Sequence, residues 1–350
     1  MNLAIISFTK AGSILNAKIA KLLNKEHHSI TYYKGRCEES LTLQEVEVPL
    51  KDWCKEVFHT MDGIIFIGAC AIAVRTIAPF VQDKMNDPLV LVLDEKASFV
   101  ISLLSGHLGG GNELTQALSE QIGAIPVITT ATDVNHKFAV DELARKEKLT
   151  ISDRKLAKEV SATILDGERI GFVSRLLIQG ELPMELEHIN EEDDIKHELG
   201  ICITCDEYDT PFINTLILMP RVITIGVGCR KNTDTEQFES FILRILKENH
   251  ISIRAVKNIA SIDLKENEPC IRAFANKYEV DFLIFSAKQL EQAEGEFEES
   301  EFVKLTTGVG NVCERSAMLA CRQPTLLLRK KAFEGMTIAL TKEKRGIRFE

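Results

Sequence analysis

The sequence predicts an α/β protein whose N-terminal part is a doubly wound, mostly parallel sheet. Short apolar runs, such as Asn2–Phe8 and Gly63–Ala69, alternate with segments of helical periodicity. Apolar strands that alternate with helices are typical of sheets covered by helices. With 45% hydrophobic and 27% charged residues, the 350-residue chain has the composition of a folded protein and the length of two or three domains.

We expect an N-terminal α/β domain over residues 1–137. After the first strand and a loop at residues 9–12, apolar residues recur at helical spacing from Ile14 to Leu23. Further strands are expected at Gly63–Ala69, Pro88–Asp94, Phe99–Leu103 and Ile125–Thr130. Further helices are expected at Ala71–Phe80 and Gly111–Ile122. Ligands of such sheets bind beyond the carboxyl ends of the strands, so a site is expected there.

A small acidic α/β region is expected over residues 138–220. Helices are predicted at Phe138–Leu149 and Asp153–Leu165, and a strand at Ile170–Ser174. Its segment 181–198 is acidic and without periodicity, which is typical of a surface loop or linker; an interaction site is the alternative.

A separate C-terminal α/β domain is expected over residues 221–350. Its strands are predicted at Val222–Val227, Asp281–Phe285, Thr325–Leu328 and Met336–Thr341. Its helices are predicted at Thr233–Lys247, Glu268–Tyr278 and Val312–Cys321. Residues 289–303 contain six acidic residues and no basic one, so we expect a loop there.

The net charge of -10 is distributed unevenly. Residues 141–220 contain 9 Lys and Arg against 18 Asp and Glu, whereas residues 221–350 contain 21 against 19. Nucleic-acid binding requires clustered Lys and Arg, so this acidic chain without a basic stripe is not expected to bind nucleic acid. A polyanionic small molecule would bind at the two ends of the chain, away from the acidic middle.

The sequence predicts neither a membrane span nor a protein metal site. The longest apolar stretch, residues 63–74, ends at Arg75 and falls short of the ~20 residues that a transmembrane helix needs. The N-terminus is typical of a strand and not of a signal peptide, and nine scattered cysteines favour reduced thiols. We therefore expect a cytoplasmic protein. Cys202 and Cys205 form a lone pair that lacks the four ligands of a zinc site.

A glycine-rich segment between a predicted strand and a predicted helix is the most distinctive motif. Residues 103–113 read LLSGHLGGGNE. Glycines permit positive φ and close approach to a ligand, and a helix N-terminus attracts anions. The Walker and dinucleotide fingerprints are absent. We expect Gly109, Gly110 and Gly111 to form a carboxylate or oxyanion site; a tight packing turn is the alternative.

Side chains around this motif are the candidate catalytic and binding groups. A histidine has a reference pKa of ~6.5, which suits proton transfer near neutrality, so His107 is a candidate acid or base. The alternative is that His107 only forms a hydrogen bond with a neighbouring carbonyl. Glu113 and Asp133 are further acid–base candidates, and Asp133 could instead cap a helix. No GxSxG elbow surrounds the serine of the motif, which argues against a serine nucleophile. The residues expected to contact a substrate here are Ser105, Gly106, Asn112 and Thr130.

Three cations are candidate ligands for substrate carboxylates. Arg75 interrupts an apolar stretch, where it could clamp a carboxylate or extend into solvent. Arg230 follows a glycine turn after a strand of the C-terminal domain, and a second glycine turn, residues 308–310, precedes Arg315. Two such turns that each lead to an arginine suggest a second anion-binding edge in that domain. Lys265, in the segment ASIDLK (260–265), adds another cation.

Seven segments spread over nearly the whole chain form a recognisable ensemble: GACAIAVR (68–75), DPLVLVLDE (87–95), FVISLLSGHLGGGNELT (99–115), IPVITTATD (125–133), GVGCRKNT (226–233), ASIDLK (260–265) and TGVGNVCERSA (307–317). This ensemble resembles the cobalt-precorrin-5A hydrolases of anaerobic cobalamin biosynthesis, the CbiG family.

The resemblance implies a substrate and a reaction. The substrate is a cobalt-bound tetrapyrrole polycarboxylate with a δ-lactone on its ring A acetate. Water opens the lactone, and the two-carbon fragment then leaves as acetaldehyde, giving cobalt-precorrin-5B. Cobalt belongs to the substrate, so no cofactor is required. A non-catalytic carrier of tetrapyrrole intermediates is the alternative. The chain could form a homodimer and could contact methyltransferases of the pathway transiently.

That chemistry needs a base for water and donors for an oxyanion. His107 and the N–H groups of residues 109–111 are expected to supply them. Glu113, Asp133 or the same histidine would then deprotonate the alcohol.

Overall fold

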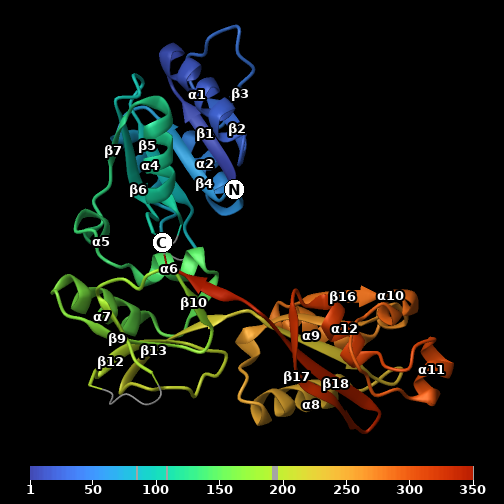
Figure 1. Cartoon of the computed structure of the whole chain (residues 1–350). Coiled ribbons are helices and arrows are strands. Elements are labelled where there is room, and N and C mark those ends of the chain that lie inside the picture. Colours follow the sequence, from blue (N-terminus) through green and yellow to red (C-terminus); the bar gives the residue numbers. More distant parts are fainter. Residues whose placement is uncertain (84–85, 108, 191–195, 350) are drawn as a thin grey trace. The chain divides into compact units, whose positions relative to one another are not determined.

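The computed structural model describes residues 1–83, 86–107, 109–190 and 196–349 (Figure 1). The chain forms two compact units, Met1–Arg145 (unit 1) and Lys146–Glu350 (unit 2). Both units combine mainly parallel sheets with helices, so the predicted α/β class is confirmed. Among the described residues, no helix combines the length and the apolar character needed to cross a bilayer.

Unit 1 is built on a seven-stranded sheet in the order β3-β2-β1-β4-β5-β6-β7. The strands are β1 (Asn2–Ser7), β2 (His28–Tyr33), β3 (Gln44–Glu45), β4 (Gly63–Ile67), β5 (Leu89–Leu93), β6 (Phe99–Leu104) and β7 (Ile125–Val127). The helices are α1 (Lys10–Leu23), α2 (Leu50–Thr60), α3 (Cys70–Ile77), α4 (Gly111–Ile122), α5 (Ala131–Val134) and α6 (Val140–Lys146), which ends one residue inside unit 2. All neighbouring strands are parallel except β5 and β6, which are antiparallel.

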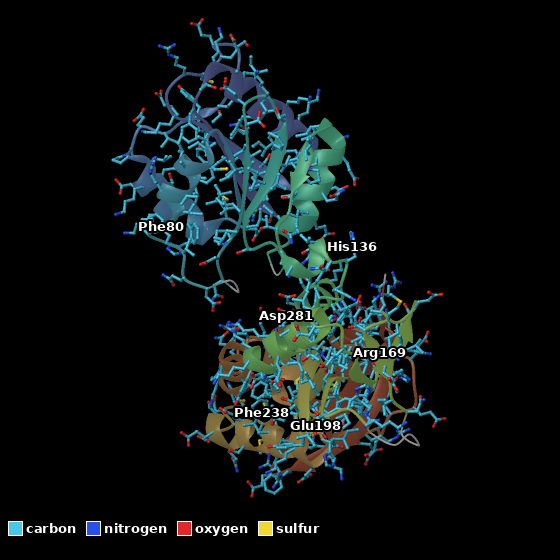
Figure 2. All side chains as sticks on the ribbon, turned by 90° about the vertical axis from the view of Figure 1, so that its left-hand side faces the viewer. Phe80, His136, Arg169, Glu198, Phe238 and Asp281 are labelled. Atoms are coloured by element: carbon cyan, nitrogen blue, oxygen red, sulfur yellow. The ribbon has the colours of Figure 1, made fainter. Side chains whose placement is uncertain are left out.

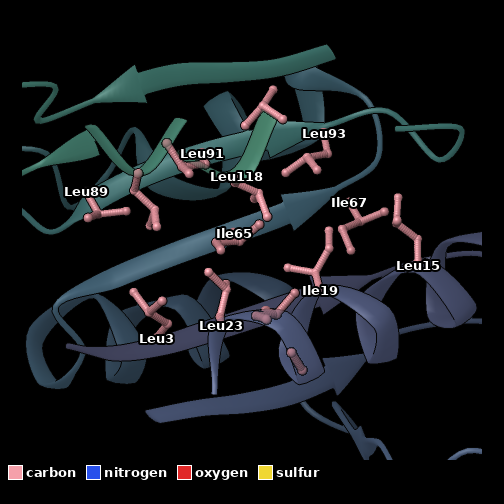
Figure 3. Close-up of a cluster of buried hydrophobic side chains, with 14 residues drawn as sticks. Leu3, Leu15, Ile19, Leu23, Ile65, Ile67, Leu89, Leu91, Leu93 and Leu118 are labelled. Atoms are coloured by element: carbon pink, nitrogen blue, oxygen red, sulfur yellow. The ribbon is translucent and has the colours of Figure 1, made fainter. Parts of the chain in front are cut away.

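Helices cover both faces of this sheet, as expected for a doubly wound fold. Leu3 and Ile5 of β1 pack with α1 and α4 on one face (Figure 3). Ala4 and Ile6 of the same strand pack with α2 and α3 on the other face. Because successive strand residues point to opposite faces, a strand covered on both sides must be apolar throughout. This explains why β1, β4 and β5 were recognisable from sequence.

Unit 2 contains two five-stranded sheets, in the orders β11-β9-β12-β13-β8 and β16-β15-β14-β18-β17, and a small sheet of β10 and β19. Its strands are β8 (Leu149–Ile151), β9 (Ile170–Ser174), β10 (Leu177–Gln179), β11 (Leu186–His188), β12 (Leu199–Ile203), β13 (Asn214–Pro220), β14 (Ile223–Gly228), β15 (Val256–Ile262), β16 (Asp281–Phe285), β17 (Pro324–Phe333), β18 (Met336–Glu343) and β19 (Gly346–Arg348). Its helices are α7 (Arg154–Leu165), α8 (Thr235–Glu248), α9 (Pro269–Tyr278), α10 (Ala287–Glu291), α11 (Glu301–Thr307) and α12 (Cys313–Ala320), with 3₁₀ turns at Ile253–Ala255 and Asp263–Lys265.

Two segments that we expected to be loops contain regular structure. The acidic segment 181–198 includes β11, which pairs in parallel with β9 through Leu186 and Ile170. Glu198, labelled in Figure 2, ends this segment immediately before β12; residues 191–195 lie outside the described residues. The segment 289–303 contains the end of α10 and the start of α11, which Ser300 caps through Val303 N–H.

We predict that Ile65→Ala destabilises unit 1 by about 2–5 kcal/mol, because Ile65 is fully buried between α1 and α4 and its removal leaves a cavity. The single tryptophan, Trp53, is buried in unit 1, so its fluorescence during urea unfolding reports this unit. Ile14→Ala is the control, since Ile14 is 52% exposed and should change the free energy of unfolding by no more than about 0.5 kcal/mol. Equal effects of the two substitutions would contradict the assigned core.

Candidate functional site

The reversal of strand direction at β6 places the glycine-rich loop at one edge of the unit 1 sheet. Leu104 at the end of β6 pairs with Val90 at the start of β5. The loop then leads to Gly110, whose φ of 78° is left-handed, and α4 begins at Gly111. Ser105 has a φ of 54°, and its hydroxyl donates to the carbonyl of Asp87 at 2.9 Å. Ser105 therefore holds the loop against the chain entering β5.

Three backbone N–H groups of the loop donate to carbonyl groups of the same loop. Gly110 N–H donates to His107 O, Gly111 N–H to Ser105 O, and Asn112 N–H to Gly106 O, at 2.9–3.2 Å. A Cβ on Gly109 would lie 2.6 Å from Ser105 O. The expectation that Gly110 and Gly111 offer free N–H groups to an oxyanion is therefore wrong: these two N–H groups close a tightly packed turn.

His107 lies between two carboxylates. Its Nε2 contacts Asp133 Oδ2, and its Nδ1 lies 3.4 Å from Asp141 Oδ1. The hydroxyl of Thr132 lies 3.2 Å from the same Nε2. The His107 side chain is only 12% exposed. A ring that faces a carboxylate with each nitrogen is favoured in its doubly protonated form, in which both nitrogens donate.

The two carboxylates raise the pKa of His107 to about 9, chiefly through the hydrogen bond to Asp141 and also through Asp133, while burial opposes the shift. His107 is therefore an imidazolium at neutral pH and holds a proton instead of accepting one. The pKa of His107 in the folded chain exceeds the unfolded value of 6.5, so the interaction of His107 with Asp133 and Asp141 contributes its full stabilisation of the fold below about pH 6.5. That stabilisation is lost as the pH rises through about 9.

A cavity of about 430 Å³ opens beside His107. It is lined by Gly106, His107, Asn112, Glu113, Gln116, Ala117, Glu120, Ile128, Asp133, Glu142 and Arg145. Asn112 donates to Thr130 Oγ1 and Asp133 Oδ2, both at 3.0 Å, and thereby orients the carboxylate that contacts His107. Glu113 forms an ion pair with Arg145 and is 60% exposed, so it lies on the cavity rim and not at the imidazole.

Asp141 and Arg145 are site residues that the sequence analysis missed. Both lie on α6, one helical turn apart, so they can face the same side. The Nε of Arg145 is buried and has no hydrogen-bond partner, while one of its terminal nitrogens pairs with Glu113. Arg145 therefore supplies a positive group to the cavity. The i,i+4 spacing of an acid and a base in a predicted helix was the signal that could have identified them.

The three predicted cations do not join this cavity. Arg75 is exposed on α3 and lines neither this cavity nor the larger one in unit 2. Arg230 and Lys265 both line a cavity of about 780 Å³ in unit 2. Lys265 Nζ lies 2.8 Å from Glu268 Oε2, so its charge is partly engaged within the protein.

The unit 2 cavity combines a cationic rim with apolar walls. Its basic residues are Arg230, Lys231, Lys265 and Lys330, against two acidic ones, Asp263 and Glu268. Its apolar lining includes Ile262, Leu264, Phe302, Val303, Val312 and Met336. Phe302, on α11, is 78% exposed at this cavity. Such a cavity suits a flat apolar molecule with carboxylates on its periphery.

We predict that His107 titrates near pH 9 in the folded protein and that Asp141→Asn lowers its pKa towards 6.5 by removing the principal cause of the shift. NMR titration of the eight histidine side chains, with His107→Gln for assignment, measures this directly. Asp52→Asn, an exposed change on α2, is the control. A His107 midpoint near 6.5 in the unaltered chain would refute the imidazolium assignment.

Three consecutive regions of the chain match models of known protein families. Three family models match it: Cobalamin synthesis G N-terminal over residues 52–133, Cobalamin biosynthesis central region over 138–220, and Cobalamin synthesis G C-terminus over 223–341. Together they account for most of the chain.

Known proteins are similar to this chain over most of its length. A cobalt-precorrin-5A hydrolase of Salmonella typhimurium is 37% identical over 82% of this chain and 83% of its own. A protein of the same name from Priestia megaterium is 29% identical over 96% and 94%. The crystal structure of a cobalamin biosynthesis protein G homolog from Sulfolobus solfataricus covers 97% of both chains at 21% identity, with a TM-score of 0.43. The chain thus belongs to the CbiG family of cobalamin biosynthesis, as its motifs predicted.

Proposed function

We propose that this chain hydrolyses the ring A δ-lactone of cobalt-precorrin-5A and releases acetaldehyde, giving cobalt-precorrin-5B. The names of its relatives support the substrate. The observation that carries the chemistry is the His107 ring between Asp133 and Asp141, at the wall of the unit 1 cavity. Lactone opening needs a group that accepts a proton from water and one that gives a proton to the leaving oxygen. A carboxylate and an imidazolium in contact meet both needs.

In the first step, Asp133 accepts a proton from water as the water oxygen attacks the lactone carbonyl. Arg145 and His107 stabilise the negative oxygen of the tetrahedral intermediate. The ring C–O bond then breaks, and His107 gives its proton to the departing alkoxide. The products are an alcohol and a carboxylic acid, which loses its proton to solvent. This role differs from our sequence-based expectation, in which His107 was the base for this step.

In the second step, His107 is neutral and, with its raised pKa, is a strong base. It takes the proton of the alcohol, the carbon–carbon bond breaks, and acetaldehyde leaves. The electron pair of that bond goes to the macrocycle, where a carbon takes up the proton held by Asp133. His107 and Asp133 thereby return to their initial protonation states, and one proton is released overall, from the new carboxylic acid. Cobalt remains with the substrate, and no cofactor is needed.

We propose that the unit 2 cavity is a binding site of its own for the macrocycle, in addition to the reaction site of unit 1. Its volume and its apolar walls suit a tetrapyrrole, and its cationic rim suits the peripheral carboxylates. The same cavity also supports a second candidate function, that of a carrier that binds the intermediate without changing it. Measurement of acetaldehyde during turnover separates the two, since a carrier releases none.

We predict that His107→Gln lowers kcat by about 10²–10⁴, because an amide can donate a hydrogen bond but cannot transfer a proton. Acetaldehyde release from cobalt-precorrin-5A is the measurement. In the unaltered enzyme kcat/KM should be constant around neutrality and fall as the pH rises through about 9, where His107 loses its proton. His59→Gln, an exposed change on α2, is the control and should keep full activity. Full activity of His107→Gln would contradict the proposal. So would a fall of kcat/KM at high pH that is the same in His107→Gln as in the unaltered enzyme.

We predict that Arg230→Ala raises KM by about tenfold and changes kcat much less, because it removes a charge of the unit 2 cavity that attracts the carboxylates of the substrate and leaves the groups at His107 unchanged. Steady-state kinetics give both constants. Arg322→Ala is the matched control, since Arg322 is exposed and does not line the cavity. A loss confined to kcat would mean that unit 2 contributes to the chemistry.

A further inference from the structure

Two thiols and a carboxylate converge at the wall of the unit 2 cavity. Cys229 follows β14, while Glu268 and Cys270 stand at the start of α9. The Cys229 and Cys270 sulfurs are 3.9 Å apart, and the three ligand atoms all lie within 4.8 Å of one another. Cys270 is fully buried and Glu268 is 6% exposed. Cys229 and Glu268 line the cavity.

We propose that Cys229, Glu268 and Cys270 bind a divalent transition-metal ion of the zinc type, Zn²⁺ or Co²⁺, whose fourth coordination position opens into the unit 2 cavity. This site would belong to the protein and is distinct from the cobalt of the substrate. It departs from our expectation that the chain holds no metal, and it does not rest on the proposed reaction.

The spacing of the sulfurs fits a shared metal. With Zn–S bonds of about 2.3 Å, tetrahedral geometry separates two sulfur ligands by about 3.8 Å. The observed 3.9 Å needs almost no adjustment. A disulfide would require the sulfurs to approach to about 2.05 Å, which is nearly 2 Å closer. Three protein ligands with one open position are typical of zinc sites that bind water or an exogenous group.

The surrounding charges fit a dication. Two thiolates and a carboxylate carry three negative charges, and the Lys265 ammonium, 2.8 Å from Glu268, offsets one of them. A divalent ion neutralises the remaining two. The Glu268 carboxylate also accepts from Asn232 N–H at 2.8 Å, so its orientation is fixed by groups outside the ligand set, as is usual for metal-binding carboxylates.

Thiols bind a metal ion as thiolates, so metal binding at Cys229 and Cys270 should release protons.

Titration of the full-length chain with Co²⁺ tests the site. The protein is first reduced, treated with a chelator and kept under argon. We expect thiolate-to-cobalt charge-transfer absorption in the near ultraviolet, and ligand-field bands of tetrahedral intensity in the visible, that saturate at about one equivalent and vanish when Zn²⁺ is added. Cys229→Ser and Cys270→Ser should each lose at least half of the charge-transfer absorption, because each leaves a single thiolate, and Glu268→Gln should weaken Co²⁺ binding about tenfold or more.

Cys321→Ser is the matched control, since Cys321 is also a buried thiol of unit 2 but lies outside the cluster; it should keep the full spectrum. Circular dichroism verifies that each variant folds. If Cys270→Ser does not fold, the half-buried Cys229→Ser provides the test. Absence of the charge-transfer band, or its persistence at full intensity in Cys229→Ser, overturns the proposal. Loss of two thiols in air without any Co²⁺ binding identifies the pair as a redox couple and equally overturns it.

Discussion

The antiparallel pairing of β5 with β6 is the constraint on which the unit 1 site depends. It sends β6, and β7 beside it, against the direction of the other strands, so their carboxyl ends lie at the edge where β4 and β5 begin. The loop that bears His107 and the turn that bears Asp133 both leave the sheet at that edge. Without this reversal the glycine-rich loop would emerge beside Asp94, at the opposite edge.

Burial and charge together decide the chemistry of His107. A buried imidazolium alone is unfavourable, and so is a buried carboxylate alone. When the two are in contact, the attraction between their charges offsets the cost of burying them. A second carboxylate, Asp141, further favours the protonated form of His107. A histidine in this setting is a reservoir of one proton near neutrality. The same neighbours that make it a poor base at rest make it a strong one once its proton has been given away.

Much of the fold could be predicted from the sequence, because strands buried on both faces are apolar throughout. This held for β1, β4, β5 and β9, and α4 was predicted with its observed bounds. It failed for β2, whose residues His28–Tyr33 are polar or half-buried, and for α2, where Lys51, Asp52 and Lys55 hide the apolar stripe.

For the site, the sequence identified the loop of His107 and the turn of Asp133, but not the contact of the imidazole with Asp141. That contact joins residues 34 positions apart through tertiary packing, and local spacing does not reveal it. The fate of the loop N–H groups was also hidden, since a glycine run is compatible both with an open anion site and with a turn closed on itself.

The two cavities differ in charge, which suggests that they interact with different parts of a substrate. The unit 1 cavity is lined by Glu113, Glu120, Asp133 and Glu142 against His107 and Arg145, so acids prevail. The unit 2 cavity has four bases against two acids. A polycarboxylate is attracted to the second and repelled by the first. The lactone of the proposed substrate, however, is uncharged, so an acidic cavity does not repel it. In the proposed reaction, ring opening creates a carboxylate that the same acids repel, and this repulsion favours release of the product.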